Sequence, residues 1–404
     1  MQTSLRLRMG LATVVFFTAM GVAPGGSAQA KKPGWVVAWA SSMQGLAQNV
    51  TPTNATFRMV ARPTIGGDSM RIRLENTFGT VPVTIGAASV GLRARLSALV
   101  DGSSVGLTFG GSPSVTIPAG GRVISDQVRL RVEAWQDVAV TLYLPGANVP
   151  VTAHNGAVTT SYLTPSDAGN HVADSGNTVF TVTTTSMYFL SSIEVYTSAA
   201  QGAIVAFGDS ITDGTCSTLD AHDRWEDVLA LRLLLERGAG WAVVNEGIGG
   251  NTVTRKNLDP PAASPPGIER LDRDVLEHSG VTHVVVFEAT NDIRRGASAD
   301  AVIAGLQDIV SRIKTAKLKV IGVTVIPRQG SMGWDPAMTA VRNKVNDWIR
   351  QRAGFDAVID FDKVVLNPAD RDVISPAYNC GDSVHPNPFG YLTMGRSIDL
   401  KLFK

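Results

Sequence analysis

The stretch from Ala203 to Phe207 is the feature of this sequence that most constrains the fold. Its small and β-branched apolar residues are typical of a fully buried strand, and it stops at Gly208-Asp209-Ser210. Further apolar runs of strand length follow at residues 241–245, 282–287, 320–326 and 357–361. Helical periodicity separates or follows them, at residues 224–236, 268–277, 300–315, 336–351 and 388–402. This alternation of buried strands with helices predicts a parallel, three-layer α/β sheet.

The chain before this region has a different pattern of apolar and charged residues. Apolar and charged residues alternate over Met70–Glu75 and Val128–Val132, and a further alternating run covers Val138–Leu144. Such alternation is typical of half-buried strands, and turn signals separate the runs. The pattern predicts an all-β sandwich or jelly roll. Because this pattern changes near residues 198–202, we expect a β domain over 31–200 and an α/β domain over 201–404.

The first thirty residues resemble a targeting segment. Arg6 and Arg8 precede an apolar run, and Ala28-Gln29-Ala30 follows as a small-residue cleavage site. We interpret residues 1–30 as a signal peptide, with a membrane anchor as the alternative, and expect a secreted protein, extracellular or periplasmic. No later run is long enough to cross a bilayer. The net charge is +1 and no basic stripe is present, so a nucleic-acid partner is not expected.

The strand-end serine has a potential general base far along the chain. The sequence has six histidines, and His385 is the one with a carboxylate, Asp382, positioned to orient it within one short loop. A serine needs such a base to act as a nucleophile, and the carboxylate holds the imidazole in the required tautomer. Ser210, His385 and Asp382 are therefore predicted to form an acyl-transfer site. We expect Asp209 to brace the turn rather than to act on the nucleophile.

Two further strand ends could stabilise a developing oxyanion. Residues 245–252 supply closely spaced glycines whose backbone N–H groups can approach a ligand, and residues 287–292 supply a side-chain amide. Three polar loops leaving adjacent parallel strands are stronger evidence together than any one alone. His154, in the β region, is expected to be a structural turn histidine, with a position in the cleft as the alternative.

The two cysteines lie close in sequence to the predicted site. Cys216 follows Ser210 by six residues, and Cys380 precedes His385 by five. If Ser210 and His385 meet, the cysteines come close as well, and an exported protein meets oxidising conditions. We predict a disulfide that joins the two loops. Two separate buried thiols are the alternative.

Taken together, these segments resemble the SGNH hydrolase (GDSL esterase/lipase) family over roughly residues 203–402. Gly208-Asp209-Ser210 resembles its nucleophile block, Gly250 and Asn291 match its oxyanion glycine and asparagine, and Asp382-Ser383-Val384-His385 matches its last block. The resemblance implies a flavodoxin-like, five-stranded parallel sheet, ester hydrolysis, and no metal or cofactor. It also implies an oxyanion hole made by the N–H groups of Ser210 and Gly250 and the Asn291 amide.

The sequence departs from the family in one block. Ala289 stands where the family often has glycine, and no role can be given to the neighbouring Glu288. The preferred function is a secreted serine esterase that acts through an acyl-enzyme on short-chain acyl or acetyl esters of small molecules or polysaccharides. One alternative is a lipase or lysophospholipase for longer acyl chains. Another is a carbohydrate-binding or adhesion protein with a vestigial hydrolase domain.

Overall fold

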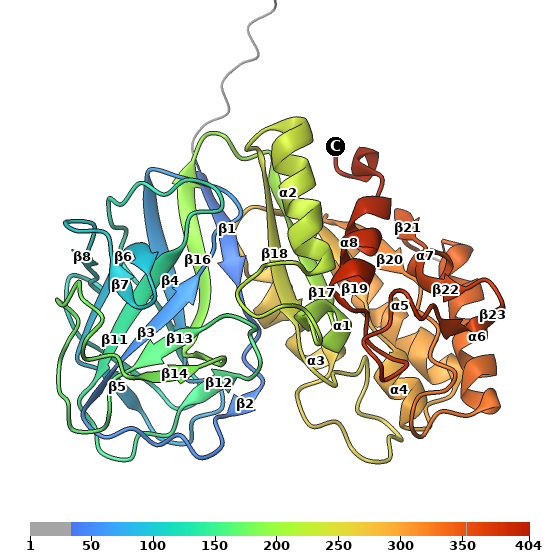
Figure 1. Ribbon diagram of the computed structural model, residues 1–404, viewed down its shortest axis with the longest axis horizontal. Coiled ribbons are helices and arrows are strands. Elements are labelled where there is room, and N and C mark those ends of the chain that lie inside the picture. Colours follow the sequence, from blue (N-terminus) through green and yellow to red (C-terminus); the bar gives the residue numbers. More distant parts are fainter. Residues whose placement is uncertain (1–33, 353) are drawn as a thin grey trace, which may run out of the picture. The chain divides into compact units, whose positions relative to one another are not determined.

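The computed structural model describes residues 34–352 and 354–404 (Figure 1). The predicted signal peptide of residues 1–30 lies outside these residues. Within them, no helix is long and apolar enough to cross a membrane.

A parallel sheet forms the framework of the C-terminal half. Its strands, in spatial order, are β18 (Trp241–Gly247), β17 (Gly202–Gly208), β19 (Val281–Phe287), β20 (Lys319–Val323) and β21 (Ala357–Ile359). All neighbouring strands are parallel. The first strand in the chain, β17, lies second in the sheet, and β18 follows it at the edge. The remaining strands, β19 to β21, add in sequence on the other side of β17, which is the flavodoxin-like order. The prediction of a five-stranded parallel sheet is confirmed.

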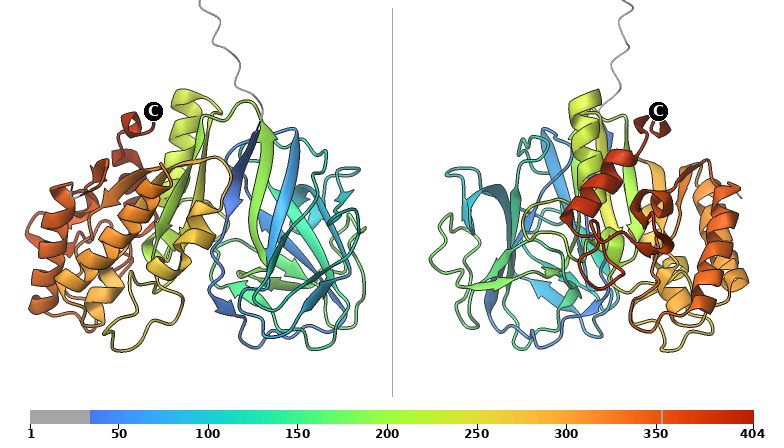
Figure 2. Two further views of the ribbon diagram at one scale, coloured as in Figure 1. Left: turned by 180° about the vertical axis from the view of Figure 1, so that it is seen from behind. Right: turned by 45° about the vertical axis from the view of Figure 1, so that its right-hand side comes forward.

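Helices cover both faces of this sheet, as expected for three layers. The long helices are α2 (Trp225–Arg237), α5 (Ala299–Thr315), α6 (Pro336–Arg350) and α8 (Pro388–Ser397). Ile204 and Ala206 of β17 pack in one apolar cluster with α2 and α8, whereas Val205 and Phe207 pack in another with α5 and α6. Figure 2 shows the helices around the sheet from behind and from an oblique angle. Because successive side chains of a strand point to opposite faces of the sheet, β17 contributes to the apolar core on each face.

Several short elements lie between the predicted ones. They are α1 (Ser210–Asp213), α3 (Gly267–Leu271) with a π-helical turn at Asp272–Leu276, α4 (Thr290–Arg294), α7 (Phe361–Val365), the hairpin β22 (Leu366–Asn367) and β23 (Asp370–Ile374), and a 3₁₀ turn at Leu400–Leu402. Of these, the region of α3 and the 3₁₀ turn at Leu400–Leu402 fall within segments that had a helical pattern in the sequence, although the helix expected over 388–402 ends at Ser397. A single turn is too short to show periodicity, so α1 and α4 were not predicted.

The N-terminal half consists of antiparallel sheets, which confirms the predicted β fold. One sheet contains β1 (Gly34–Ala40), β16 (Leu190–Thr197), β4 (Ser69–Glu75) and β10 (Arg122–Ile124). The larger one contains β14 (Val182–Thr184), β13 (Ser161–Leu163), β3 (Ala55–Ala61), β11 (Val138–Leu144), β6 (Ala87–Arg95), β7 (Ala98–Leu99) and β8 (Val105–Gly106). Small sheets of β2 (Gly45–Leu46), β12 (Thr152–His154) and β15 (Met187–Tyr188), and of β5 (Val83–Ile85) and β9 (Val115–Ile117), complete it.

The strand expected over Val128–Val132 is not formed as a strand. Its alternation is real, because Val128, Leu130 and Val132 are buried while Arg129 and Arg131 are exposed. However, the backbone pairs only at its two ends, with Met70 and Gly67, as isolated bridges. The alternation in the sequence therefore predicted correctly which side chains are buried, but it did not predict that the continuous hydrogen-bond ladder is missing.

The two halves share apolar core and backbone contacts. One cluster of buried apolar side chains includes residues of β1 and β16 as well as of β17 and β18. Thr64 Oγ1 lies 2.9 Å from both the N and the O of Val243, on the otherwise open edge of β18. Such contacts satisfy backbone groups that an edge strand would leave free. The domain boundary near residue 200 stays a prediction.

Candidate active site

Ser210 lies at the carboxyl end of β17, in the first turn of α1. Asp209 caps that turn, since its Oδ1 accepts the N–H of Ile211 at 2.9 Å. The preceding Gly208 is required by space: a Cβ there would lie 2.3 Å from Thr212 Oγ1 and 2.6 Å from the Phe287 carbonyl oxygen. The strand and the capped turn thus hold the Ser210 hydroxyl at the carboxyl end of the sheet, where α/β folds place their ligands.

His385 and Asp382 meet this serine. Ser210 Oγ lies 2.9 Å from His385 Nε2, and His385 Nδ1 lies 2.6 Å from Asp382 Oδ2. Asp382 Oδ1 also accepts the backbone N–H groups of Val384 and His385 at 2.8 and 2.9 Å. Burial alone would raise the pKa of Asp382, but these hydrogen bonds outweigh it and hold the pKa below its ordinary value. The structure therefore brings together the three residues predicted for acyl transfer, with the carboxylate ionised.

The predicted disulfide between Cys216 and Cys380 is present, so the alternative of two separate thiols is wrong. It joins the loop after α1 to the loop that carries His385. In the same region Cys380 N donates to the His385 carbonyl at 3.0 Å, and the Tyr391 hydroxyl donates to the Thr215 carbonyl at 2.7 Å. These links fix the distance between the serine and histidine loops.

The loops after β18 and β19 lie beside Ser210 and are tied to each other. Asn291 Nδ2 donates to the Asn251 carbonyl at 2.9 Å, next to Gly250, which has φ +72°. Asp292 accepts the N–H groups of Val253 and Thr254 at 2.9 and 3.1 Å. Among residues 34–352 and 354–404, the N–H groups of Ser210 and Gly250 have no hydrogen-bond acceptor. They are therefore free to receive a ligand oxygen.

Ala289, the departure from the family pattern, has an unusual backbone conformation. It precedes α4 with φ +110° and is fully buried. Non-glycine residues enter such conformations at a cost of about 1–3 kcal/mol, which explains why glycine suits this position. The turn nevertheless forms and presents Asn291 on α4.

His154 lies at the end of β12 and not in a turn, so that expectation is wrong. Its Nε2 lies 3.0 Å from Asp213 Oδ1 and its Nδ1 lies 2.8 Å from the Ser42 carbonyl oxygen. Both partners are acceptors, which an imidazole satisfies only when both nitrogens carry a proton. Burial would lower the pKa of His154, but the Asp213 charge and these hydrogen bonds outweigh it and raise the pKa.

Asp213 links His154 to the loops of the candidate site. It lies in α1, three residues after Ser210, and its Oδ2 accepts the N–H of Gly249 at 2.8 Å. One carboxylate therefore joins the serine turn, the glycine loop and, through His154, the β half. His154 itself contacts neither Ser210 nor His385 in the described residues, so it can act on the site only through Asp213.

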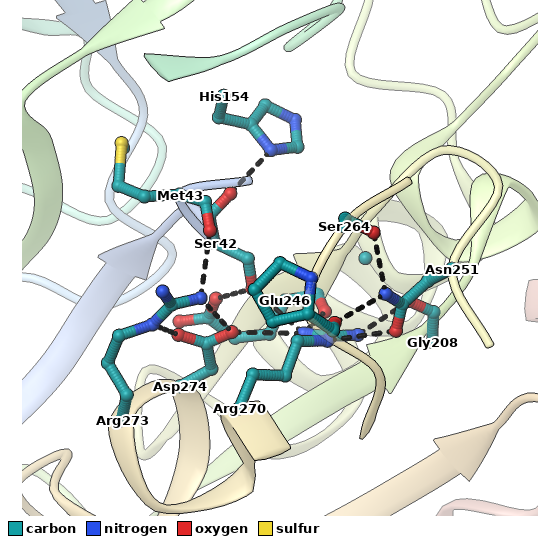
Figure 3. A network of polar contacts seen from close by, with 12 residues as sticks. Ser42, Met43, His154, Gly208, Glu246, Asn251, Ser264, Arg270, Arg273 and Asp274 are labelled. Carbon is teal, nitrogen blue, oxygen red and sulfur yellow. Dashed lines mark hydrogen bonds and ion pairs between the residues drawn. The ribbon is translucent and has the colours of Figure 1, made fainter. Parts of the chain in front are cut away.

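Arg270, on α3, was missed by the sequence analysis and explains Glu288. Its guanidinium is fully buried and donates to the Gly208 carbonyl at 2.9 Å and the Glu246 carbonyl at 2.8 Å (Figure 3). It also pairs with Glu288 Oε1 at 3.2 Å. A carboxylate at the end of a buried strand requires a partner, so Glu288 was the signal that a buried cation lies nearby. The arginine connects the ends of β17, β18 and β19.

Further charges surround Arg270. Asp274 pairs with Arg270 at 3.1 Å and with Arg273 at 2.5 Å. Burial would raise the pKa of Asp274, but the two arginines outweigh it and lower the pKa to about 2. Burial raises the pKa of both Glu246 and Glu288, and the charge and hydrogen bond of Arg270 oppose this rise at Glu288. Ser42, from the β half, donates to Glu246 and accepts from Arg270. This cluster has a structural role, since it contacts the carboxyl ends of the strands.

The described residues contain one group of potential metal ligands, Cys216, Cys380 and Asp382. Its two sulfur atoms are bonded to each other and its carboxylate holds His385, so this group is not suited to bind a metal.

Comparison with known proteins gives a family match within the C-terminal half and similarity to solved structures. Residues 206–392 match the model of the GDSL-like Lipase/Acylhydrolase family. A member of the lipolytic protein G-D-S-L family from Veillonella parvula shares 23% identity, with 50% of this chain and 97% of that chain covered and a TM-score of 0.38. A carbohydrate acetylesterase from Sinorhizobium meliloti shares 18% identity over 49% of this chain and 96% of its own, with a TM-score of 0.37. No curated protein sequence matches the chain.

The parallel sheet and the matched segment define an SGNH hydrolase domain. Residues 206–392 match the GDSL-like Lipase/Acylhydrolase family, and the chain is a carboxylic ester hydrolase. The β half lies outside the matched residues.

Removal of the disulfide should weaken the fold. We expect the double variant Cys216→Ser, Cys380→Ser to lose about 2–5 kcal/mol of the free energy of unfolding, since the bridge closes a long loop. Urea unfolding measures this. As a control, a reductant should lower the wild-type midpoint to that of the double variant and leave the double variant itself unchanged. Equal midpoints for wild type and double variant without reductant would contradict the prediction.

Substitution of His154 should have a pH-dependent effect on stability. In the folded state the raised pKa of His154 favours the imidazolium, so its contribution is fully present below about pH 6.5 and is lost as pH rises through the folded pKa. His154→Gln should therefore cost about 1.5–3 kcal/mol at about pH 5.5 and less at about pH 9.5. Unfolding of both proteins across this range measures the difference. A constant or rising difference would mean that the folded protein holds His154 neutral.

Proposed function

We propose that this chain is a secreted serine esterase in which Ser210, His385 and Asp382 are the catalytic triad. The single observation that carries the proposal is the hydrogen-bond chain from Ser210 Oγ through His385 to Asp382, at 2.9 and 2.6 Å. Three residues scattered through the sequence meet there with the donor and acceptor roles that acyl transfer requires.

The geometry supports a two-step reaction. His385 Nε2 accepts the Ser210 proton as Oγ attacks the ester carbonyl, while Asp382 stabilises the imidazolium. His385 then protonates the leaving alcohol, and an acyl-Ser210 intermediate remains. Water activated by His385 hydrolyses this intermediate and releases the carboxylic acid, which restores the free serine.

The proposed oxyanion hole consists of the N–H groups of Ser210 and Gly250 and the Asn291 amide. The two N–H groups are free in the described structure, and Asn291 Nδ2 uses one hydrogen for Asn251 and keeps one for substrate. The loop contacts described above hold these donors in position before substrate binds, which is what makes such donors effective.

A short acyl group, such as acetyl on a small molecule or a polysaccharide, suits this site better than a long chain. Six of the eight residues that line the pocket beside Asn291 and Asp382 are polar or charged, three of them arginines, and Met332 and Val384 are its apolar side chains. A long acyl chain would require an extended apolar surface. We further propose that the protein is exported, which is supported by the signal-like residues 1–30 and the Cys216–Cys380 bond.

The triad is tested by Ser210→Ala and His385→Ala. Each should lower kcat on 4-nitrophenyl acetate by about 10⁴-fold or more, because triad members act as a unit. Circular dichroism should remain that of the wild type. His171→Ala, which removes an imidazole in the β half that pairs with Asp174, is the matched control and should stay active. Turnover by Ser210→Ala near the wild-type rate would refute the assignment.

The oxyanion role is tested by Asn291→Ala. Loss of one preorganised donor should lower kcat by about 10²–10³-fold with little change in KM, because the donor acts on charge that develops only in the transition state. Asn177→Ala, at an exposed position of the β half, is the control. A change in KM with an unaltered kcat would assign Asn291 to ground-state binding instead.

A further inference from the structure

We propose that the pocket beside the triad binds a carboxylate carried by the substrate, so that the enzyme prefers anionic esters to neutral ones of the same size. This inference rests on the proposed function of Ser210 and names the substrate class of that same site.

The pocket lies next to the predicted catalytic groups. It is a hollow of about 660 Å³, counting space open to solvent, lined by Asn291, Arg294, Arg295, Arg328, Ser331, Met332, Asp382 and Val384. Asn291 belongs to the proposed oxyanion hole and Asp382 to the triad. A substrate whose ester carbonyl lies at Ser210 can therefore extend into this pocket and reach three guanidinium groups.

The positive charge of these arginines is not neutralised by ion pairs. Within the described ranges, none of the three lies within 4.0 Å of a carboxylate oxygen. Arg294 is half-buried, and its side chain makes no hydrogen bond to any described residue. Arg295 donates to the carbonyl groups of Pro260 and Pro261. Elsewhere on this chain, the fully buried Arg270 and Arg342 form ion pairs, whereas the fully buried Arg58 donates to three carbonyl groups and a hydroxyl.

Arg328 is the most informative of the three. Its residue is only 6% exposed, and its guanidinium lies 5.2 Å from the centre of the Trp334 ring. Nε and Nη1 reach Ser331 and Thr290, whereas Nη2 donates to no atom in the described part of the chain. Because Arg328 lines the pocket, this nitrogen can donate to an anion bound there.

The two carboxylates whose charges act on Arg328 are already in use. These are Asp209, which caps α1, and Asp382, which holds His385. Neither can move to Arg328 without disrupting the serine turn or the histidine. The pocket thus keeps a positive excess that an incoming anion can balance, and a guanidinium matches the planar geometry of a carboxylate.

The test compares matched ester pairs on the full-length enzyme. With the carboxylate on the alcohol side, 4-acetoxybenzoate is compared with 4-acetoxybenzamide. With the carboxylate on the acyl side, mono-4-nitrophenyl adipate is compared with 4-nitrophenyl hexanoate. We expect the anionic ester to have about a tenfold higher kcat/KM in one of the pairs, and that pair shows which side of the ester the pocket takes. This ratio should fall as salt is added.

Variants assign the preference to this pocket. Arg294→Gln should bring the anionic-to-neutral ratio of kcat/KM close to one, and Arg294→Lys should keep part of it because the charge remains. Arg129→Gln, which removes an exposed arginine of the β half, is the matched control and should keep the full ratio.

The outcomes separate this inference from the proposed function. Ratios near one or below one in both pairs overturn the carboxylate site, and so does a high ratio that survives in Arg294→Gln. If 4-nitrophenyl acetate itself is not hydrolysed in a Ser210-dependent way, the proposed function fails instead.

Discussion

The buried guanidinium of Arg270 holds together the carboxyl ends of the strands in the parallel sheet. It donates to the carbonyl groups of Gly208 and Glu246 and pairs with Glu288, so one side chain holds the ends of three neighbouring strands. Each of those strands leads into a loop of the candidate site. Removal of such a cation would leave buried carboxyl and carbonyl groups without a partner, which is among the most costly changes in a protein interior.

The histidine loop and the β half are attached to this framework by different means. A covalent bond, Cys216–Cys380, ties the histidine loop to the serine loop. The β half reaches the same turn through polar contacts, because His154 pairs with Asp213 and Ser42 joins the Arg270 cluster. The β half is thus more than an appended module: part of the structure that supports the serine turn comes from it.

Much of the fold could be predicted because the relevant signals are local. The continuous apolar runs at 203–207 and 282–287 identify buried strands by themselves, and the helices between them show clear periodicity. The single turns α1 and α4 have no period to detect, and Val128–Val132 shows alternation without forming a ladder. Arg270 could not be identified as the partner of Glu288, since nothing local in the sequence marks an arginine that contacts Ser42 across 228 positions.

The order of strands and helices, the candidate nucleophile Ser210 and the pair Asp382 and His385 could all be identified from the sequence, because each is a local pattern. The groups that surround them became known from the three-dimensional arrangement: the imidazole of His154 beside Asp213, the buried cluster of Arg270, and the three arginines beside Asn291. The physical reason is that charge and burial are properties of neighbours in space. A side chain's partners, and therefore its protonation state and its role, exist only after distant segments have packed together.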